Sequence, residues 1–167
     1  GRVMIDKAIF ERIIRRIDSY GEPMFQMQSD LTAIPALSPE NDGDGEHKKA
    51  EYLHSCLRYF GFSDVIKINA PDERVSTGIR PNIIATIPGR CRDKTVWILT
   101  HMDIVPPGEM TSWEGSPYKA YLKDGSIYGR GAADNQQDMV ASIFAAKAFI
   151  EEAILPANSI GLALVAD

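Results

Sequence analysis

The sequence predicts a layered α/β fold, in which a sheet is flanked by helices. Apolar residues recur at helical spacing through the first sixty positions, whereas short β-rich apolar runs dominate residues 65–128. A long helical pattern at 135–153 and a further apolar run at 160–166 then follow. Strands interleaved with helices are typical of a sheet covered by helices, and no linker or repeat divides the chain, so we expect one unit over residues 1–167.

Three helices are expected before the first strand. In the first, isoleucines recur at helical spacing, and these are Ile5, Ile9, Ile13 and Ile17. Gly21 ends it, and Pro23 can open a second helix that runs to residue 34. Residues 35–45 form a loop, and a third helix over 46–60 is closed by a glycine in the left-handed conformation.

Strands are expected at 65–68, 82–87 and 95–101. The last of these is nearly continuously apolar, which is typical of a strand covered on both faces. Asp124-Gly125, between two short β-rich runs, predicts a hairpin. The apolar run 160–166 is typical of a central, buried strand. Because domains seldom finish on such a strand, the chain is expected to be a fragment of a longer protein.

Composition excludes several classes of protein. Lys and Arg number 18 and Asp and Glu 23, a formal net charge of −5 that argues against nucleic-acid and anionic-membrane partners. No apolar run approaches the ~20 residues of a membrane span, and the first residues lack the apolar core of a signal peptide. Cys56, expected to be buried, and Cys91, expected to be exposed, form no framework and suit a reducing cytoplasm.

His101 and Asp103 lie where the third predicted strand ends. Alternation along an extended chain puts both side chains on the same side. A metal-binding His usually has its second ring nitrogen fixed by a carboxylate, and ligands of open α/β sheets bind outside the carboxyl ends of the strands. The pair therefore fits a metal site. The alternative is a His–Asp pair that only satisfies itself at the strand end.

Asp134 lies at the start of the long helix, after the glycine-rich turn 129–131. The helix dipole favours a carboxylate at this place, so the side chain can be either an N-cap or a metal ligand. A phosphate-binding loop is excluded, because no Gly-Lys-Ser/Thr follows.

Two other groups of polar residues offer weaker metal sites. Acidic residues at EF-hand spacing lie before and within the start of the third helix, and these are Glu40, Asp42, Asp44 and Glu51. Pro35 and Pro39 forbid the incoming helix, so an acidic loop that caps the third helix is preferred to a calcium site. His47 and His54 lie two helical turns, or ~10 Å, apart, which is too far to share one zinc ion.

Taken in order, the motifs resemble those of the M20 metallopeptidase and deacylase family, which includes succinyl-diaminopimelate desuccinylase, acetylornithine deacetylase, aminoacylase-1 and carboxypeptidase G2. The resemblance rests on His-Met-Asp-Ile-Val-Pro-Pro-Gly at 101–108, on Trp113, and on Asp-Gly-Ser-Ile-Tyr-Gly-Arg-Gly-Ala-Ala-Asp-Asn at 124–135. Residues 34–39 resemble the early Ile-Pro-Ser-x-Ser stretch of the family. Members often have Lys-Gly where this chain has Gln136-Gln137.

The resemblance implies the fold of zinc-dependent exopeptidases and a hydrolase that cleaves the amide bond of N-acyl amino acids or small peptides. It implies that His101 binds one metal ion, that Asp134 bridges two, and that Asp103 is a catalytic-site residue that orients His101. The peptide bond between Asp134 and Asn135 is implied to be cis. The complete site takes two zinc ions, with cobalt as a substitute.

The resemblance also implies what lies outside the chain. Asp167 fits the first residue of the family's Asp-Glu-Glu motif, whose glutamates are the general base and a further ligand. Residues 1–167 are then the N-terminal portion of the catalytic domain, inactive alone and without the lid domain that usually forms a homodimer. The alternative from another class is a non-catalytic α/β domain that serves in binding or assembly.

Overall fold

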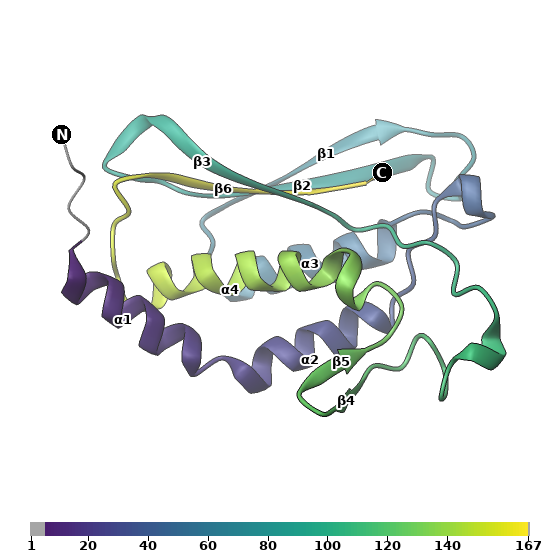
Figure 1. Cartoon of the computed structure of the whole chain (residues 1–167). Coiled ribbons are helices and arrows are strands. Elements are labelled where there is room, and N and C mark those ends of the chain that lie inside the picture. The colour runs from purple at the N-terminus through teal and green to yellow at the C-terminus, as the bar shows by residue number, and fades with distance from the viewer. Residues whose placement is uncertain (1–5, 167) are drawn as a thin grey trace.

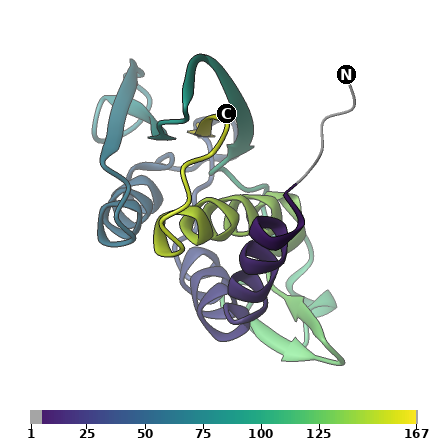
Figure 2. The ribbon, with the colours of Figure 1, turned by 90° about the vertical axis from the view of Figure 1, so that its left-hand side faces the viewer.

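In the computed structural model the described residues, 6–166, form a sheet with helices on one of its faces (Figure 1). The helices are α1 (Lys7–Asp18), α2 (Gly21–Thr32), α3 (His47–Tyr59) and α4 (Gln137–Glu151). α3 and α4 pack against the sheet, whereas α1 and α2 pack on the side of α4 that faces away from it (Figure 2). The predicted layered α/β fold is confirmed.

The main sheet has the strand order β1-β2-β6-β3. Its strands are β1 (Asp64–Pro71), β2 (Ile79–Ile87), β3 (Cys91–His101) and β6 (Asn158–Val165). β6 pairs in parallel with β3 and antiparallel with β2, and β2 pairs antiparallel with β1. The last strand of the sequence therefore lies inside the sheet, as its apolar run predicted.

A two-stranded hairpin, β4 (Tyr121–Lys123) and β5 (Ser126–Tyr128), precedes the long helix. Its turn residues Asp124 and Gly125 have φ angles of 52° and 75°. Positive φ at both central positions is what a two-residue turn of type I′ needs, and the predicted hairpin is confirmed.

The core lies between the sheet and the two helices that cover it. Alternate residues of β2 and β6 point toward the helices, which is why Ile83, Ala85, Leu162 and Leu164 are buried. They meet the apolar stripes of α3 and α4, whose buried members include Leu53, Leu57, Met139, Ile143 and Phe144. Burial on this scale contributes on the order of 2 kcal/mol for each large side chain.

β3 differs from the prediction of a strand covered on both faces. It is an edge strand of the described sheet, and Val96, Trp97, Ile98 and Leu99 are between 36% and 70% exposed. A continuous apolar run indicates that a strand has buried surface on both faces, but it does not say which segments provide the cover. Within residues 6–166, β6 is its one strand neighbour, so the second side of β3 is open.

The ends of the helices depart from the predictions in three places. α1 begins at Lys7, where Asp6 caps it by accepting from two backbone N–H groups, and Ile5 lies outside the described residues. Gly21 is the first residue of α2 rather than a spacer before it. The acidic loop does not cap α3, because Glu46 precedes this helix without a side-chain cap and pairs with Arg80 instead.

Both cysteines are free, with Cys56 half-buried and Cys91 exposed. Among residues 6–166 no helix is both long and apolar enough to cross a membrane.

Candidate metal centre

His101, the last residue of β3, lies between two carboxylates. Its ring nitrogen Nδ1 is 2.9 Å from Oδ1 of Asp103, and Nε2 is 3.1 Å from Oδ1 of Asp134. The chain between the first pair is anchored, since Met102 is buried and its N–H donates to the carbonyl oxygen of Val165 at 2.8 Å. Asp103 thus contacts the Nδ1 side of the ring, and the two side chains lie on the same side of the chain, as alternation along the strand predicted.

Asp134 reaches His101 from a turn that precedes α4. This turn, Ala132–Gln136, is kinked in the middle, where Asp134 (φ −123°, ψ 96°) and Asn135 (φ −132°, ψ 33°) have non-helical backbone angles. The peptide bond between Asp134 and Asn135 is cis, as the resemblance implied. The side-chain oxygen of Asn135 accepts from the backbone N–H of His101 at 2.9 Å. Two contacts therefore connect this turn to the end of β3.

The electrostatics of the ring require a cation or a second proton. A neutral imidazole carries one N–H, and if Nδ1 donates it to Asp103, then Nε2 presents a lone pair to the Asp134 carboxylate. Partial burial opposes the charged form of His101, but the Asp103 and Asp134 carboxylates together raise its pKa above the usual value. Protonation, or a metal ion between Nε2 and Asp134, relieves the repulsion.

The donor set fits a metal ion. Two donors placed about 2.0–2.1 Å from a tetrahedral zinc ion lie roughly 3.3 Å apart, close to the separation of Nε2 and the carboxylate oxygen. The side chain of Asp134 is 78% exposed and that of His101 34%, so both are open to solvent. Among residues 6–166 no group of three His, Cys, Asp or Glu side chains is placed to bind one metal ion. The described residues thus bring together two candidate ligands, His101 and Asp134.

Asp134 is not the N-cap of α4, because that helix begins after Gln136 and has no side-chain cap. The pair of His101 and Asp103 forms at the strand end, but it leaves the second ring nitrogen directed at Asp134 rather than satisfied within the pair.

The sequence of this chain is also similar to those of known proteins. Residues 97–167 match the sequence model of peptidase family M20/M25/M40. A metallohydrolase of Methanocaldococcus jannaschii is 36% identical over 150 residues, which are 87% of this chain and 36% of that protein. This chain belongs to peptidase family M20.

One further relative and one solved structure are also similar to this chain. Succinyl-diaminopimelate desuccinylase of Delftia acidovorans is 31% identical over 143 residues, which cover 85% of this chain and 35% of that enzyme. The structure of human carnosine dipeptidase 1 shares the fold, with a TM-score of 0.77 at 23% identity over 93% of this chain and 34% of that one. The chain thus spans about a third of the length of the curated relatives that it matches.

The loop that follows the M20 motif at His101 is fixed beside the site. The indole N–H of Trp113 donates to the carbonyl oxygen of Pro107 at 3.0 Å, and the guanidinium of Arg130 donates to the same oxygen at 3.3 Å. Arg130 also lies over the Trp113 ring, 5.2 Å from its centroid. A cation over an indole face adds to these contacts, so the Pro-Pro-Gly turn is connected to the Asp134 turn.

Sequence reasoning missed a buried polar cluster next to the site. Gln136, at the end of the Asp134 turn, is buried and accepts a hydrogen bond from the buried ammonium of Lys49 at 3.0 Å. Lys49 lies four residues before Leu53 and therefore on the apolar stripe of α3, which is the signal that could have revealed it. A lysine on a helix is ordinarily solvated, so composition alone does not indicate its burial.

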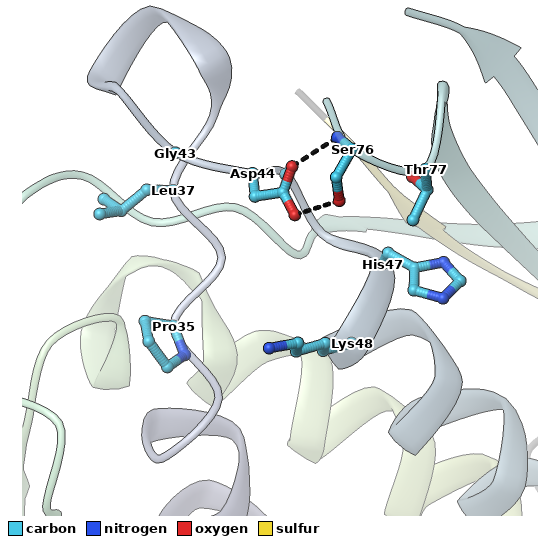
Figure 3. Close-up of a pocket in the computed structure, with 9 residues that line it drawn as sticks. Pro35, Leu37, Gly43, Asp44, His47, Lys48, Ser76 and Thr77 are labelled. Carbon is cyan, nitrogen blue, oxygen red and sulfur yellow. Dashed lines mark hydrogen bonds between the residues drawn. The ribbon is translucent and has the colours of Figure 1, made fainter. Parts of the chain in front are cut away.

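A separate pocket of about 220 Å³ lies where the acidic loop meets α3 (Figure 3). His47 and Lys48 come from the first turn of α3 and point in different directions. Asp44 accepts from the N–H and the hydroxyl of Ser76, and these hydrogen bonds lower the pKa of its carboxyl. Asp44 thus connects the acidic loop to the segment that carries Ser76.

Proposed function

We propose that this chain carries two of the protein ligands of a dinuclear zinc centre in a hydrolase of N-acyl amino acids or small peptides. The observation that carries the proposal is His101, oriented by Asp103 on one ring nitrogen and facing Asp134 with the other. A ligating His with a carboxylate behind it is the arrangement that metal sites favour. The printed names of the relatives, a metallohydrolase, a desuccinylase and a dipeptidase, support the reaction class.

Each residue has a separate task in the proposed site. Asp103 accepts the Nδ1 proton of His101 and thereby leaves the Nε2 lone pair free to bind a metal ion. Asp134 would help to hold both metal ions, and its anionic oxygen would offset part of their charge. When bound, the metal supplies Lewis-acid activation of water and of the amide carbonyl. Asn135 anchors the Asp134 turn to β3 through the backbone N–H of His101.

We further propose that residues 1–167 are the N-terminal portion of the M20 catalytic domain. The chain spans about a third of its relatives, and two ligands are fewer than the three or four of a tight zinc site. The general base and the remaining ligands then come from other parts of the protein. Two free cysteines support a reducing, cytoplasmic location.

The proposal is tested first by metal binding. The chain has three histidines, so zinc chloride titrated into the ¹⁵N-labelled protein can be followed at each imidazole by NMR. We expect the signals of His101 to move, and Asp134→Asn to abolish that response. His54→Ala is the matched control and should leave it unchanged.

Activity provides the second test. The 167-residue chain alone should release no amine from N-succinyl or N-acetyl amino acids or from dipeptides. A longer protein that contains it should do so, and should lose activity with Asp134→Asn. Amidase activity of the isolated chain that survives this substitution would contradict the proposal. If zinc leaves the NMR signals of His101 unchanged, the alternative of a non-catalytic binding domain would be favoured instead.

A further inference from the structure

A buried lysine connects to both parts of the candidate metal centre. Lys49 of α3 has no exposed surface, and its ammonium donates to the side-chain oxygen of Gln136. Burial lowers the pKa of Lys49 to about 8, whereas the neighbouring Asp103 and Glu46 carboxylates act in the opposite direction. A buried ammonium is costly unless its surroundings compensate it, so its position points to a specific task.

The first connection is a hydrogen-bond network that ends at the Asp134 turn. The side-chain amide of Gln136, the last residue of that turn, donates to the hydroxyl of Thr32 at 3.1 Å and to the side-chain oxygen of Gln28 at 3.3 Å. Its own oxygen accepts from Lys49 at 3.0 Å. All four side chains are at most 5% exposed. Both the nitrogen and the oxygen of the Gln136 amide thus have hydrogen-bond partners, and Lys49 is the donor to the oxygen.

The second connection is electrostatic. Glu46, one of the two carboxylates near Lys49, already forms hydrogen bonds with the guanidinium of Arg80 through both of its oxygens. Asp103 forms its salt bridge with His101, and no Lys or Arg of the described residues forms another with it. Of the two carboxylates, Asp103 is therefore the one whose charge Lys49 is left to balance.

We propose that Lys49 is a positioning residue of the metal centre. Its ammonium fixes Gln136, and with it the turn that carries Asp134, and it balances the charge of the carboxylate that orients His101. The importance of this for catalysis rests on the proposed function, but the positioning itself is a property of the metal-free chain.

Three variants test this proposal. Lys49→Met removes the ammonium and keeps a long side chain. Lys48→Met is the matched control, since it removes the same charge from the adjacent, exposed position of α3. In Lys49→Met/Gln136→Lys an ammonium returns to the same place from the other element, because the two polar atoms that exchange are 3.0 Å apart.

Each ¹⁵N-labelled chain is examined without metal by long-range ¹H–¹⁵N correlation, then titrated with zinc chloride, and its thermal midpoint is measured. At a pH high enough to remove the second proton, wild type should show His101 as one tautomer, with the remaining proton on Nδ1. Lys49→Met should show a mixture of tautomers and roughly tenfold weaker zinc binding at His101. The signals of His47 and His54 should not move, and a cooperative thermal transition would show that the variant is folded. The double variant and Lys48→Met should match wild type.

An unchanged His101 tautomer and zinc affinity in Lys49→Met would overturn the proposal. So would a change that Gln136→Lys does not reverse, because lost packing would then explain it. If Lys49→Met does not fold, Gln136→Leu removes the acceptor instead and should produce the same tautomer mixture; wild-type behaviour there refutes the idea. If zinc leaves the signals of wild-type His101 unchanged, only the proposed function is contradicted. The proposal for Lys49 is still tested, because it is decided by the tautomers of the metal-free chain.

Discussion

The buried ion pair between Arg80 and Glu46 should be one of the most sensitive points of the fold. Arg80 on β2 donates to both oxygens of Glu46, with 2.7 Å between Nε and Oε2, and the side chains are 7% and 0% exposed. Arg80→Met keeps the apolar stem but leaves a carboxylate in the interior without its guanidinium. We expect this substitution to destabilise the chain strongly.

The magnitude follows from what remains beside Glu46. Removal of one partner of a buried ion pair costs about 3–5 kcal/mol, because the other charge stays in a medium that solvates it poorly. Lys49 is close enough to interact with Glu46, which favours the lower end of this range. A loss of about 3 kcal/mol corresponds to a fall of roughly 6–12 °C in the thermal midpoint of a chain of this size.

Urea denaturation followed by tryptophan fluorescence and by circular dichroism would measure the loss. Lys123→Met is the matched control, since it removes a cation from the exposed pair with Glu114, and pairs of this kind contribute little. The double variant Arg80→Met/Glu46→Leu should regain most of the stability, because it removes both charges. A loss for Arg80→Met no larger than that for Lys123→Met would refute the reasoning.

Three further predictions concern single positions. Burial lowers the pKa of Lys49 to about 8 from 10.5, so the native protein binds fewer protons than the unfolded protein between these pH values. The free energy of unfolding should therefore rise between pH 8 and 10.5 by up to about 3 kcal/mol more in wild type than in Lys49→Met. Urea titrations at each pH would measure this difference. Asp103→Asn should weaken zinc binding at His101 by about 10–100-fold in NMR titrations, with the thermal midpoint retained. Gly89→Ala should lower the thermal midpoint, because a Cβ there would lie 2.2 Å from the backbone of β6, whereas Gly115→Ala meets nothing within 4 Å and should not.

The elements that the sequence predicted well are those whose signal is local. The hairpin follows from two adjacent turn residues, and α4 and β6 follow from long runs with a clear period. The pairing of His101 with Asp103 is equally local, since alternation along one strand places both side chains on the same side.

The elements that the sequence predicted poorly depend on distant neighbours. Whether β3 is an edge strand is decided by which segments lie beside it, and the apolar run at 96–99 does not encode that. Glu46 lies 34 residues from Arg80, so its preference for an ion pair over capping α3 becomes visible only in three dimensions. The contact of Asp134 with His101 spans 33 residues, and it was expected from the family resemblance rather than from any pattern within the chain.

The open side of β3 links assembly of the sheet to completion of the site. The far edge of β3 offers backbone N–H and carbonyl groups to an incoming strand, and the apolar side chains at 96–99 give that strand a surface to cover. β3 ends at His101, so a strand added along the full length of this edge would bring one of its own ends beside the backbone of His101. A segment that pairs with the edge would therefore lie next to the candidate metal centre, and a change to one would affect the other.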